Sequence, residues 1–350
     1  MLYSNIYEED VENTLKLCIP WSELTNKTVL ITGATGLICS FLVDVLMYRN
    51  EIYKSNIRVI ITARNQIKAE KRFDRYIKNK KFIILEQNVG EFFSIKDTSI
   101  DYIIHGASNA DPLSFSNDPI GTMLANINGM NNLLKYALSQ NKVRTLFLST
   151  GEVYGENLGN VVNLSEDSYG YINPTNPRSC YPESKRAAET LCASYVKQHQ
   201  LDVVVARLCH VYGPTMLKTD SRVIAQFIRS AVSGNDIVLK SKGLQKRSYC
   251  YVSDAVGAIL SILLVGESGQ AYNISNNSTG VSIRELAETI AKMYSLKIIN
   301  EIPESSEKAG YSIINNAILN STKIELLGWK AQIKLEEGIS KTVEILKDLY

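Results

Sequence analysis

The sequence has few residues that bind metals, and none of them has the spacing of a metal site. Its 350 residues include only three histidines and six cysteines, and no two cysteines form a C-x-x-C pair. This spacing offers no cage for zinc or a similar ion. In a reducing compartment, such thiols are expected to be small and mostly buried apolar groups.

A strong charge of one sign is also absent. The formal net charge is only +2, so the chain lacks the basic field that nucleic-acid binding requires. The opening stretch, MLYSNIYEEDVENTLKLCIPW, has neither a positive leader nor a long apolar run. The sequence therefore predicts a cytoplasmic protein without a signal peptide, a membrane span or a nucleic-acid partner.

The sequence does contain a regular alternation of short strands and helices. Runs rich in β-branched residues, such as TVLITG and IRVIITA, alternate with helical apolar patterns such as LICSFLVDVLMYRN. This alternation predicts an α/β fold with a Rossmann-like, doubly wound parallel sheet covered by helices on both faces. A smaller α/β C-terminal lobe is expected at the carboxyl ends of the strands, where such sheets bind ligands.

The alternation weakens after about residue 210, which divides the chain into three expected parts. They are an N-terminal helical extension (1–26), a dinucleotide-binding domain (27–210) and a mainly substrate-binding lobe (211–350). The extension has apolar residues on one predicted helix face, namely Tyr7, Val11, Leu15 and Cys18. Both docking onto the domain and an oligomer contact are open as its role.

A glycine turn connects the first strand to the first long helix. Gly33 and Gly36 in ITGATGLICSF have the spacing of a dinucleotide turn, in which amides at a helix N-terminus attract pyrophosphate. Cys39 occupies the third position, where glycine would let the helix pack closely on the strand. Because cysteine is small, we expect a working site. The alternative is a turn that only reverses the chain.

Tyr181 and Lys185 form a second candidate site in CYPESK. A separation of four residues places both on one helix face, where the ammonium group would favour the phenolate. With a nearby cofactor cation, the pair would lower the tyrosine pKa from about 10 towards neutrality and create a base. The pattern alone is common on solvated helices, so its meaning depends on the glycine turn.

Five co-linear blocks resemble the extended short-chain dehydrogenase/reductase superfamily, specifically the nucleotide-sugar branch of the NAD-dependent epimerase/dehydratase family. They are TGATGLI, HGASNADPLSFSNDPIGTMLANINGMNNLL, LFLSTGEVYGE, RSCYPESKRAAETLC, and RLCHVYGP with QKRSYCYVSDAV. The resemblance extends from about Lys27 to the C-terminus. Within the branch, the chain is most similar to UDP-glucuronate decarboxylases and next to dTDP-glucose 4,6-dehydratases.

The resemblance implies an enzyme that binds NAD and a nucleotide-diphosphate sugar and transiently oxidises carbon 4 of the sugar. Tyr181 would remove the 4-hydroxyl proton, Lys185 would activate Tyr181 and contact the cofactor ribose, and Thr150 would hydrogen-bond the same sugar oxygen. The other implied cofactor contacts are Gly33, Thr35, Gly36, Leu37, Ile38, Arg64, Asn88, Val89 and Ala107. The implied substrate contacts are Ser108, Thr150, His210 and Arg247. The resemblance also implies a homodimer built on two helices per subunit, one of them holding Tyr181.

The two residues after Thr150 affect which reaction follows the oxidation. Dehydratases that resemble this segment have two acids there, whereas this chain has Gly151 and Glu152. Glycine has no proton to donate, so elimination of water would lack its general acid, whereas a β-keto acid loses carbon dioxide without one. Decarboxylases usually have serine at this position, so Gly151 departs from both patterns. Glu152 would orient a water or the substrate, or pair with a backbone group or an arginine.

Cofactor choice depends on the end of the second strand. NAD proteins usually have an acid there for the adenosine ribose, but RVIITARN has none. Arg64 would meet the 2′-phosphate of NADP, or it is a solvated loop cation. Enzymes that oxidise and then re-reduce one substrate usually keep NAD, which is the expected cofactor, with NADP as the alternative.

Two further residues have a ligand-binding and a structural interpretation. Arg247 matches a family arginine near the phosphates or the sugar carboxylate. Its planar guanidinium would bind such an oxyanion with two hydrogen bonds. The alternative is a surface arginine without a ligand. His210 would hydrogen-bond sugar or phosphate, or be a partly buried structural histidine.

The leading function is decarboxylation of UDP-glucuronate. The alternatives are a 4,6-dehydratase, a 4-epimerase, an NADPH-dependent 4-keto-sugar reductase and a non-catalytic nucleotide-binding protein.

Overall fold

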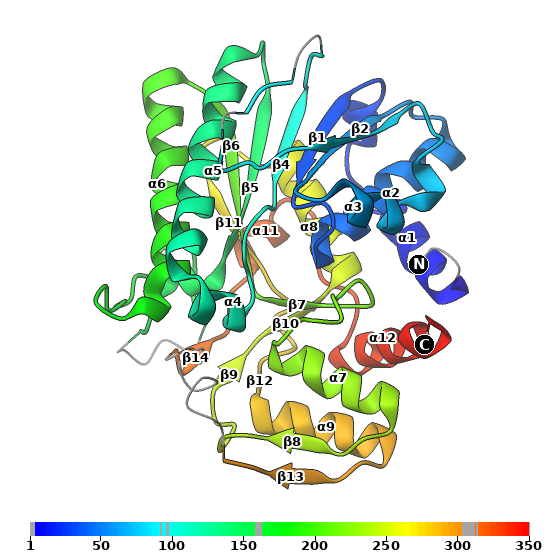
Figure 1. Cartoon of the computed structure of the whole chain (residues 1–350), viewed down its shortest axis with the longest axis vertical. Helices are drawn as coiled ribbons and strands as arrows, with labels where there is room; N and C mark the ends of the chain where they lie inside the picture. Colours follow the sequence, from blue (N-terminus) through cyan, green and yellow to red (C-terminus); the bar gives the residue numbers. More distant parts are fainter. Residues whose placement is uncertain are drawn as a thin grey trace.

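The computed structural model describes residues 4–349 except 92, 96–97, 158–162, 303–311 and 313. Its centre is a seven-stranded parallel sheet in the order β3-β2-β1-β4-β5-β6-β11 (Figure 1). The strands are β1 (Thr28–Thr32), β2 (Arg58–Ala63), β3 (Phe82–Glu86), β4 (Tyr102–His105), β5 (Arg144–Thr150), β6 (Asp202–Leu208) and β11 (Ala271–Ile274). The expected Rossmann-like α/β fold is confirmed.

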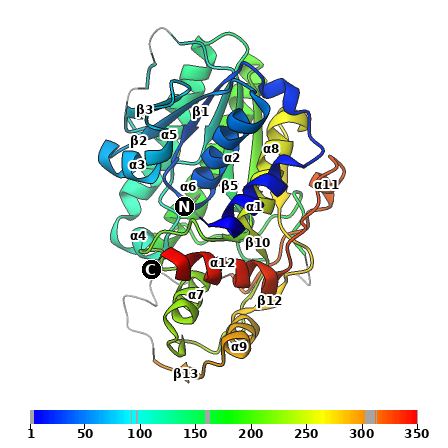
Figure 2. The ribbon, with the colours of Figure 1, turned by 90° about the vertical axis from the view of Figure 1, so that its right-hand side faces the viewer.

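Helices cover both faces of this sheet (Figure 2). One face carries α2 (Leu37–Tyr53) and α8 (Val252–Val265), and the other carries α5 (Pro119–Ser139) and α6 (Cys180–His199). Neighbouring residues of β1 point to opposite faces, so Leu30 enters the core under α5 while Ile31 enters the core under α2. This burial of both faces explains the nearly continuous apolar strands.

The C-terminal lobe lies at the carboxyl ends of the strands (Figure 1). Its helices are α7 (Val223–Ser233), α9 (Ile283–Tyr294) and α12 (Leu335–Leu349), whereas α11 (Thr322–Glu325) packs against β11 of the large sheet. Its strand pairs are β7 (His210–Tyr212) with β10 (Tyr249–Tyr251), β8 (Ile237–Leu239) with β13 (Ile298–Asn300), and β9 (Lys246–Arg247) with β12 (Val281–Ser282) and β14 (Asn316–Ala317). Three short connecting helices complete the elements that position the site: α3 (Gln66–Arg72), α4 (Pro112–Asn117) and the turn Gly151–Tyr154.

The division at residue 210 differs from the structure. β11 pairs with β6 at the edge of the large sheet, and α8 is buried along its length from Val252 to Leu263. Both elements belong to the dinucleotide-binding domain although they follow the expected boundary. The reason is topological. After β6 the chain leaves the large sheet, forms part of the lobe, and returns to the sheet as α8 and β11 before it forms the rest of the lobe.

The N-terminal extension forms α1 (Asn5–Leu15), which packs against α2, α8 and α12 (Figure 2). Of the expected apolar face, Tyr7, Val11 and Leu15 are buried. Cys18 is exposed, because the helix ends at Leu15 and the chain turns before reaching it. The segment is therefore docked onto the rest of the chain. Across the described ranges, no helix is both long and apolar enough to traverse a bilayer.

Candidate active site

The glycine turn after β1 has the geometry of a phosphate-binding site. Gly33 adopts φ of 68°, and a Cβ there would lie 2.5 Å from the backbone of Gly106, so only glycine fits. Gly36 is the N-cap of α2 and has no side-chain cap, and a Cβ at Gly36 would approach only Gly33 O, at 3.2 Å. Half-buried Thr35, Leu37 and Ile38 complete the turn. The helix N-terminus is therefore open to an anion, and the residues fit a dinucleotide pyrophosphate.

Cys39 fits its position in the same turn. Its side chain is buried, at 3% exposure, and its Sγ occupies the space that a Cβ on Gly106 would need. Burial raises the pKa of this thiol to about 12, so the group stays neutral. Gly106 thus makes room for the cysteine and keeps α2 close to the sheet.

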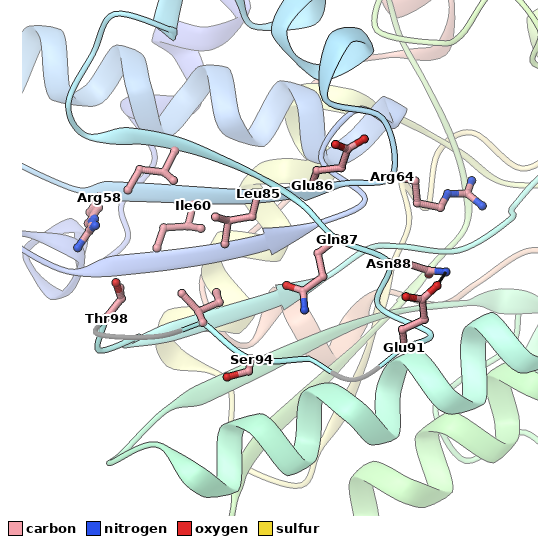
Figure 3. A pocket seen from close by; sticks show the side chains of 12 residues that line it. Arg58, Ile60, Arg64, Leu85, Glu86, Gln87, Asn88, Glu91, Ser94 and Thr98 are labelled. Carbon is pink, nitrogen blue, oxygen red and sulfur yellow. Dashed lines mark hydrogen bonds between the residues drawn. The ribbon is translucent and has the colours of Figure 1, made fainter.

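A cavity of about 890 Å³ lies beside β2 and β3 and is lined by Arg64 and Asn88 (Figure 3). The Asn88 amide donates to Glu91 at 3.1 Å. Arg64 is exposed and makes no hydrogen bond or ion pair with another described residue. The neighbouring predicted contacts lie at the same carboxyl edge of the sheet and are held by backbone or side-chain hydrogen bonds: Val89, Ala107 and Ser108.

Thr150, Tyr181 and Lys185 come together where β5 ends and α6 begins. Thr150 Oγ1 accepts a hydrogen bond from Glu152 N at 3.2 Å, and its hydroxyl is near enough to Tyr181 to act on the pKa of that phenol. Tyr181 and Lys185 are 7% and 2% exposed. The Lys185 ammonium donates to Leu148 O at 2.8 Å and lies 5.9 Å from the Tyr181 ring centre.

Burial dominates the protonation of these two residues. Burial, and then the charge of Glu152, raise the pKa of Tyr181 to about 12, against the opposing effects of Thr150 and the nearby arginines. Burial likewise lowers the pKa of Lys185 to about 7. The neutral-range tyrosine expected from the spacing is therefore not produced by the protein groups alone.

Glu152 pairs with an arginine that the sequence analysis did not single out. Arg178 Nη2 lies 2.9 Å from Glu152 Oε1, so the structure contains the arginine-paired alternative for this glutamate. The Arg178 guanidinium also lies 4.7 Å from the ring centre of Phe115 in α4. Phe115 in turn stacks on Tyr181, with ring centres 4.5 Å apart and planes 18° apart. The signal was available in part, because Arg178 stands three residues before Tyr181.

Gly151 faces an apolar side chain from the C-terminal lobe. A Cβ at this position would lie 3.0 Å from both methyl groups of Leu319. Leu319 is fully buried and packs with Val153, Tyr154 and Leu164. A serine at position 151 would therefore require Leu319 to shift, and the wall beside Thr150 is apolar.

Arg247 and His210 lie together in the lobe. Arg247 is 5% exposed, which excludes the surface alternative. The one hydrogen bond of its side chain within the described part of the chain goes to Lys246 O, at 2.8 Å, and no described carboxylate is within ion-pair distance of it. Burial, and then Arg247 and Arg222, lower the pKa of His210 to about 3, and its buried Nδ1 has no described partner. A neutral histidine and an uncompensated arginine are suited to bind an oxyanion.

These features identify the class of protein. The chain belongs to the NAD dependent epimerase/dehydratase family, whose sequence profile matches residues 29–275. The sequence-based assignment to an NAD-dependent enzyme family is thereby confirmed.

Among its relatives, the chain is 33% identical to UDP-glucuronic acid decarboxylase 6 of Arabidopsis thaliana, over 90% of this chain and 87% of the relative. It is also 33% identical to UDP-glucuronic acid decarboxylase 1 of Danio rerio, over 92% and 73%. Solved structures with the same fold include a UDP-glucose 4-epimerase of Thermotoga maritima (TM-score 0.77, 24% identity, covering 92% of this chain and 99% of that one). Another is a dTDP-glucose 4,6-dehydratase of Bacillus anthracis in complex with NAD (TM-score 0.77, 21% identity, covering 92% and 97%).

Proposed function

We propose that this protein decarboxylates UDP-glucuronate through transient oxidation at carbon 4 of the sugar. The observation that carries the proposal is the group formed by buried Tyr181 and Lys185 and half-buried Thr150, together with an anion-receptive glycine turn and the buried Arg247. Similarity to UDP-glucuronic acid decarboxylases over most of both chains supports the choice of substrate.

In this proposal, Gly33 and Gly36 cradle the cofactor pyrophosphate, and Lys185 reaches the adjacent ribose. Bound at this turn, NAD would supply a reversible hydride acceptor for carbon 4 of the sugar. Tyr181 takes the proton of the 4-hydroxyl, while Thr150 holds the same oxygen in place. The pKa of Tyr181, raised to about 12 by burial, has to fall for this step, and cationic charge brought by the ligands is the expected cause.

The 4-keto sugar acid then loses its carboxyl group. The bond between carbons 5 and 6 breaks, its electron pair moves onto the 4-keto oxygen, carbon dioxide leaves, and carbon 5 takes up a proton. This step needs no acid beside the sugar, which accords with Gly151. Tyr181 finally returns its proton to the 4-oxygen as the ketone is reduced.

The test is to incubate the purified protein with UDP-glucuronate, UDP-glucose, dTDP-glucose and their N-acetyl relatives and to identify the products by mass. We expect carbon dioxide and a UDP-pentose from UDP-glucuronate only. Loss of water would instead indicate a 4,6-dehydratase, and an unchanged mass with altered chromatography a 4-epimerase. Turnover of none of them, with Tyr181→Phe affecting only stability, would favour a non-catalytic nucleotide-binding protein.

A homodimer is the second part of the proposal. Helix α5 exposes large apolar side chains that support an interface with a second copy, namely Ile120, Met123, Leu124 and Leu138. Light scattering on the purified protein measures the mass that distinguishes monomer from dimer. The cytoplasmic location expected from the sequence stays a prediction.

A further inference from the structure

Glu189 lies on the side of α6 that faces the large sheet. Its carboxylate accepts a hydrogen bond from Ser149 of β5 at 2.5 Å. It also pairs with Arg207 of β6, whose Nη2 and Nε lie 2.7 Å and 3.1 Å from Glu189 Oε2. The side chains of this ion pair are only 13% and 15% exposed. Because Ser149 and Arg207 are partners in the register of the two strands, the carboxylate fastens α6 to both strands at one position along the sheet.

The hydrogen bonds of Arg207 continue towards the apolar wall of the candidate site. Arg207 Nη1 donates to the Tyr154 hydroxyl at 3.1 Å, and this hydroxyl donates to Asn273 at 2.5 Å. The Asn273 amide in turn donates to Asn320 O at 3.0 Å. Asn320 directly follows Leu319, which forms the wall. One connected set of hydrogen bonds therefore links α6 to the segment that forms this wall.

Glu189 follows both candidate residues of α6 at helical spacing. Lys185 is four residues earlier and Tyr181 eight residues earlier, so the three lie along one side of the helix. The Lys185 ammonium donates to Leu148 O at 2.8 Å. The next residue of β5 is Ser149, which donates to Glu189. Two successive residues of β5 are thus held by two successive turns of α6, directly before the strand ends at the candidate site.

Glu189 also supplies negative charge near Lys185. Burial lowers the pKa of the Lys185 ammonium, and Glu189 raises it. The described titratable groups that act on or contact this ammonium come from α6, α2 and β4, and they are Tyr181, Glu189, Cys192, Cys39 and His105. Burial raises the pKa values of the tyrosine and both thiols and lowers that of the histidine to about 3. These four groups are neutral at neutral pH, so Glu189 is the charged member of the set.

We propose that Glu189 is a positioning residue, which fixes α6 against the end of β5 and whose charge helps Lys185 to keep the proton that assists Tyr181. The proposal rests on the roles proposed above for Lys185 and Tyr181 and adds the residue that maintains them. Because Arg207 and Ser149 hold the carboxylate, it stabilises the ammonium from one helical turn away without forming a direct ion pair with it. The ammonium group is then available to the cofactor ribose and to the tyrosine.

A purely structural ion pair between Glu189 and Arg207 predicts a different result. Its loss would destabilise the fold and would lower turnover by the same factor at every pH. Loss of a negative charge near Lys185 instead lowers the pKa of the ammonium, because its protonated form is less stabilised. The titration of Lys185 therefore separates the two roles.

The first experiment follows this titration by NMR in the whole chain, with lysine isotopically labelled at Nζ. Burial lowers the pKa of Lys185 to about 7, whereas an exposed lysine titrates near about 10.4, so the Lys185 signal changes in a separate pH range. Glu189→Gln should move this change about one pH unit lower. Glu183→Gln is the matched control. Glu183 is on the same helix and pairs with Arg186 at 3.5 Å, but its side chain is 33% exposed, so the Lys185 titration should stay in place.

The second experiment measures turnover against pH. Glu189→Gln should lower kcat about tenfold through loss of position and move the pH profile towards lower pH, because Lys185 and Tyr181 release their shared proton more easily. Ser149→Ala should lower kcat several-fold without moving the profile, since one attachment of α6 is lost and the charge stays. If Glu189→Gln does not fold, its combination with Arg207→Gln removes the uncompensated guanidinium and should show the same shift of the Lys185 titration.

Either of two results would overturn the proposal. One is a Lys185 titration that stays in place when Glu189 is replaced by glutamine. The other is a Ser149→Ala protein with unchanged kcat at every pH. Failure of the proposed function looks different, since the NMR titration needs no sugar. Lys185 would then still respond to Glu189 in a protein that releases no carbon dioxide from UDP-glucuronate.

Discussion

Two groups of buried charges differ in how they are neutralised: those packed around α1, and the cations Lys185 and Arg247 of the candidate site. Around α1, Asp44 accepts hydrogen bonds from Tyr7 at 2.5 Å and Arg72 at 2.7 Å, and Asp10 binds Tyr251 and Lys341. In the candidate site, Lys185 and Arg247 are 2% and 5% exposed. Neither has a carboxylate within ion-pair distance among the residues that the structure describes.

This difference separates structural charge from functional charge. A buried ion without a partner carries a large desolvation cost, whereas a paired one recovers most of it. A buried ion without a protein partner is retained where a bound ligand supplies the opposite charge. Ionisable groups with shifted pKa values are therefore frequent at functional sites. We therefore expect the charges around α1 to affect stability, and Lys185 and Arg247 to affect binding and turnover.

The largest expected effect is the loss of turnover when Lys185 of the candidate site is replaced. Lys185→Met should lower turnover of the nucleotide sugar about 10²–10⁴-fold, because it removes the group proposed to assist Tyr181. The denaturation midpoint should stay the same or rise, since a buried cation without a carboxylate partner is replaced by an apolar chain of similar length. Turnover assays and urea unfolding of the same preparations check both parts. Retained turnover together with a large loss of stability would assign Lys185 to the structural group.

For the buried charges around α1 we expect the opposite result, a loss of stability with unchanged turnover. Asp44→Asn should lower the free energy of unfolding by about 3 kcal/mol, because Arg72 loses its buried counter-ion. Turnover measured well below the unfolding temperature should not change. Asp101→Asn is the control, since its pair with Lys27 has side chains that are 30% and 42% exposed and should contribute about 1 kcal/mol or less. Equal losses for the two variants would remove the distinction between buried and exposed pairs.

The buried histidines give stability a defined pH dependence. The pKa of His105 and of His210 is lowered by burial to about 3, while an unfolded histidine titrates near about 6.5. The unfolded chain therefore binds more protons between these values. The stabilisation of the folded state by these two neutral histidines is fully present above pH ~6.5 and is lost as the pH falls towards ~3.

Between pH 6 and 5, the two histidines together should reduce the free energy of unfolding by about 2 kcal/mol. His210→Asn should remove about half of this decrease. Urea unfolding at the two pH values measures it. If the free energy of unfolding falls by the same amount in the variant, His210 is already protonated in the folded protein.

The smallest effect concerns Cys39. Replacing it by glycine places a flexible residue in the first turn of α2 and empties the space beside Gly106, which should reduce stability by about 1–2 kcal/mol. Affinity for NAD should stay the same or improve, because the sulfur only fills a packing position. Complete loss of NAD binding in a titration would contradict the packing role.

Much of the fold could be predicted because its signals are local. The β-branched runs ending at the glycine turn or at Thr150 indicate buried parallel strands, and the Tyr181 and Lys185 spacing indicates one helix face. The return of β11 to the sheet could not be predicted, since a short apolar strand does not specify its neighbour. The same limit applies to the site. Leu319 faces Gly151, and Phe115 joins Arg178 to Tyr181, only through contacts between distant segments.

The docking of α1 has a mechanical consequence for the whole enzyme. This helix contacts α2, which begins at the glycine turn, and also α12 of the C-terminal lobe. A buried hydrogen bond from Tyr7 to Asp44 and a partly buried one from Lys341 to Asp10 attach it to each of them. Any movement of the C-terminal lobe relative to the large sheet is therefore expected to be a rotation about an axis near α1, with the largest displacement on the side away from this helix.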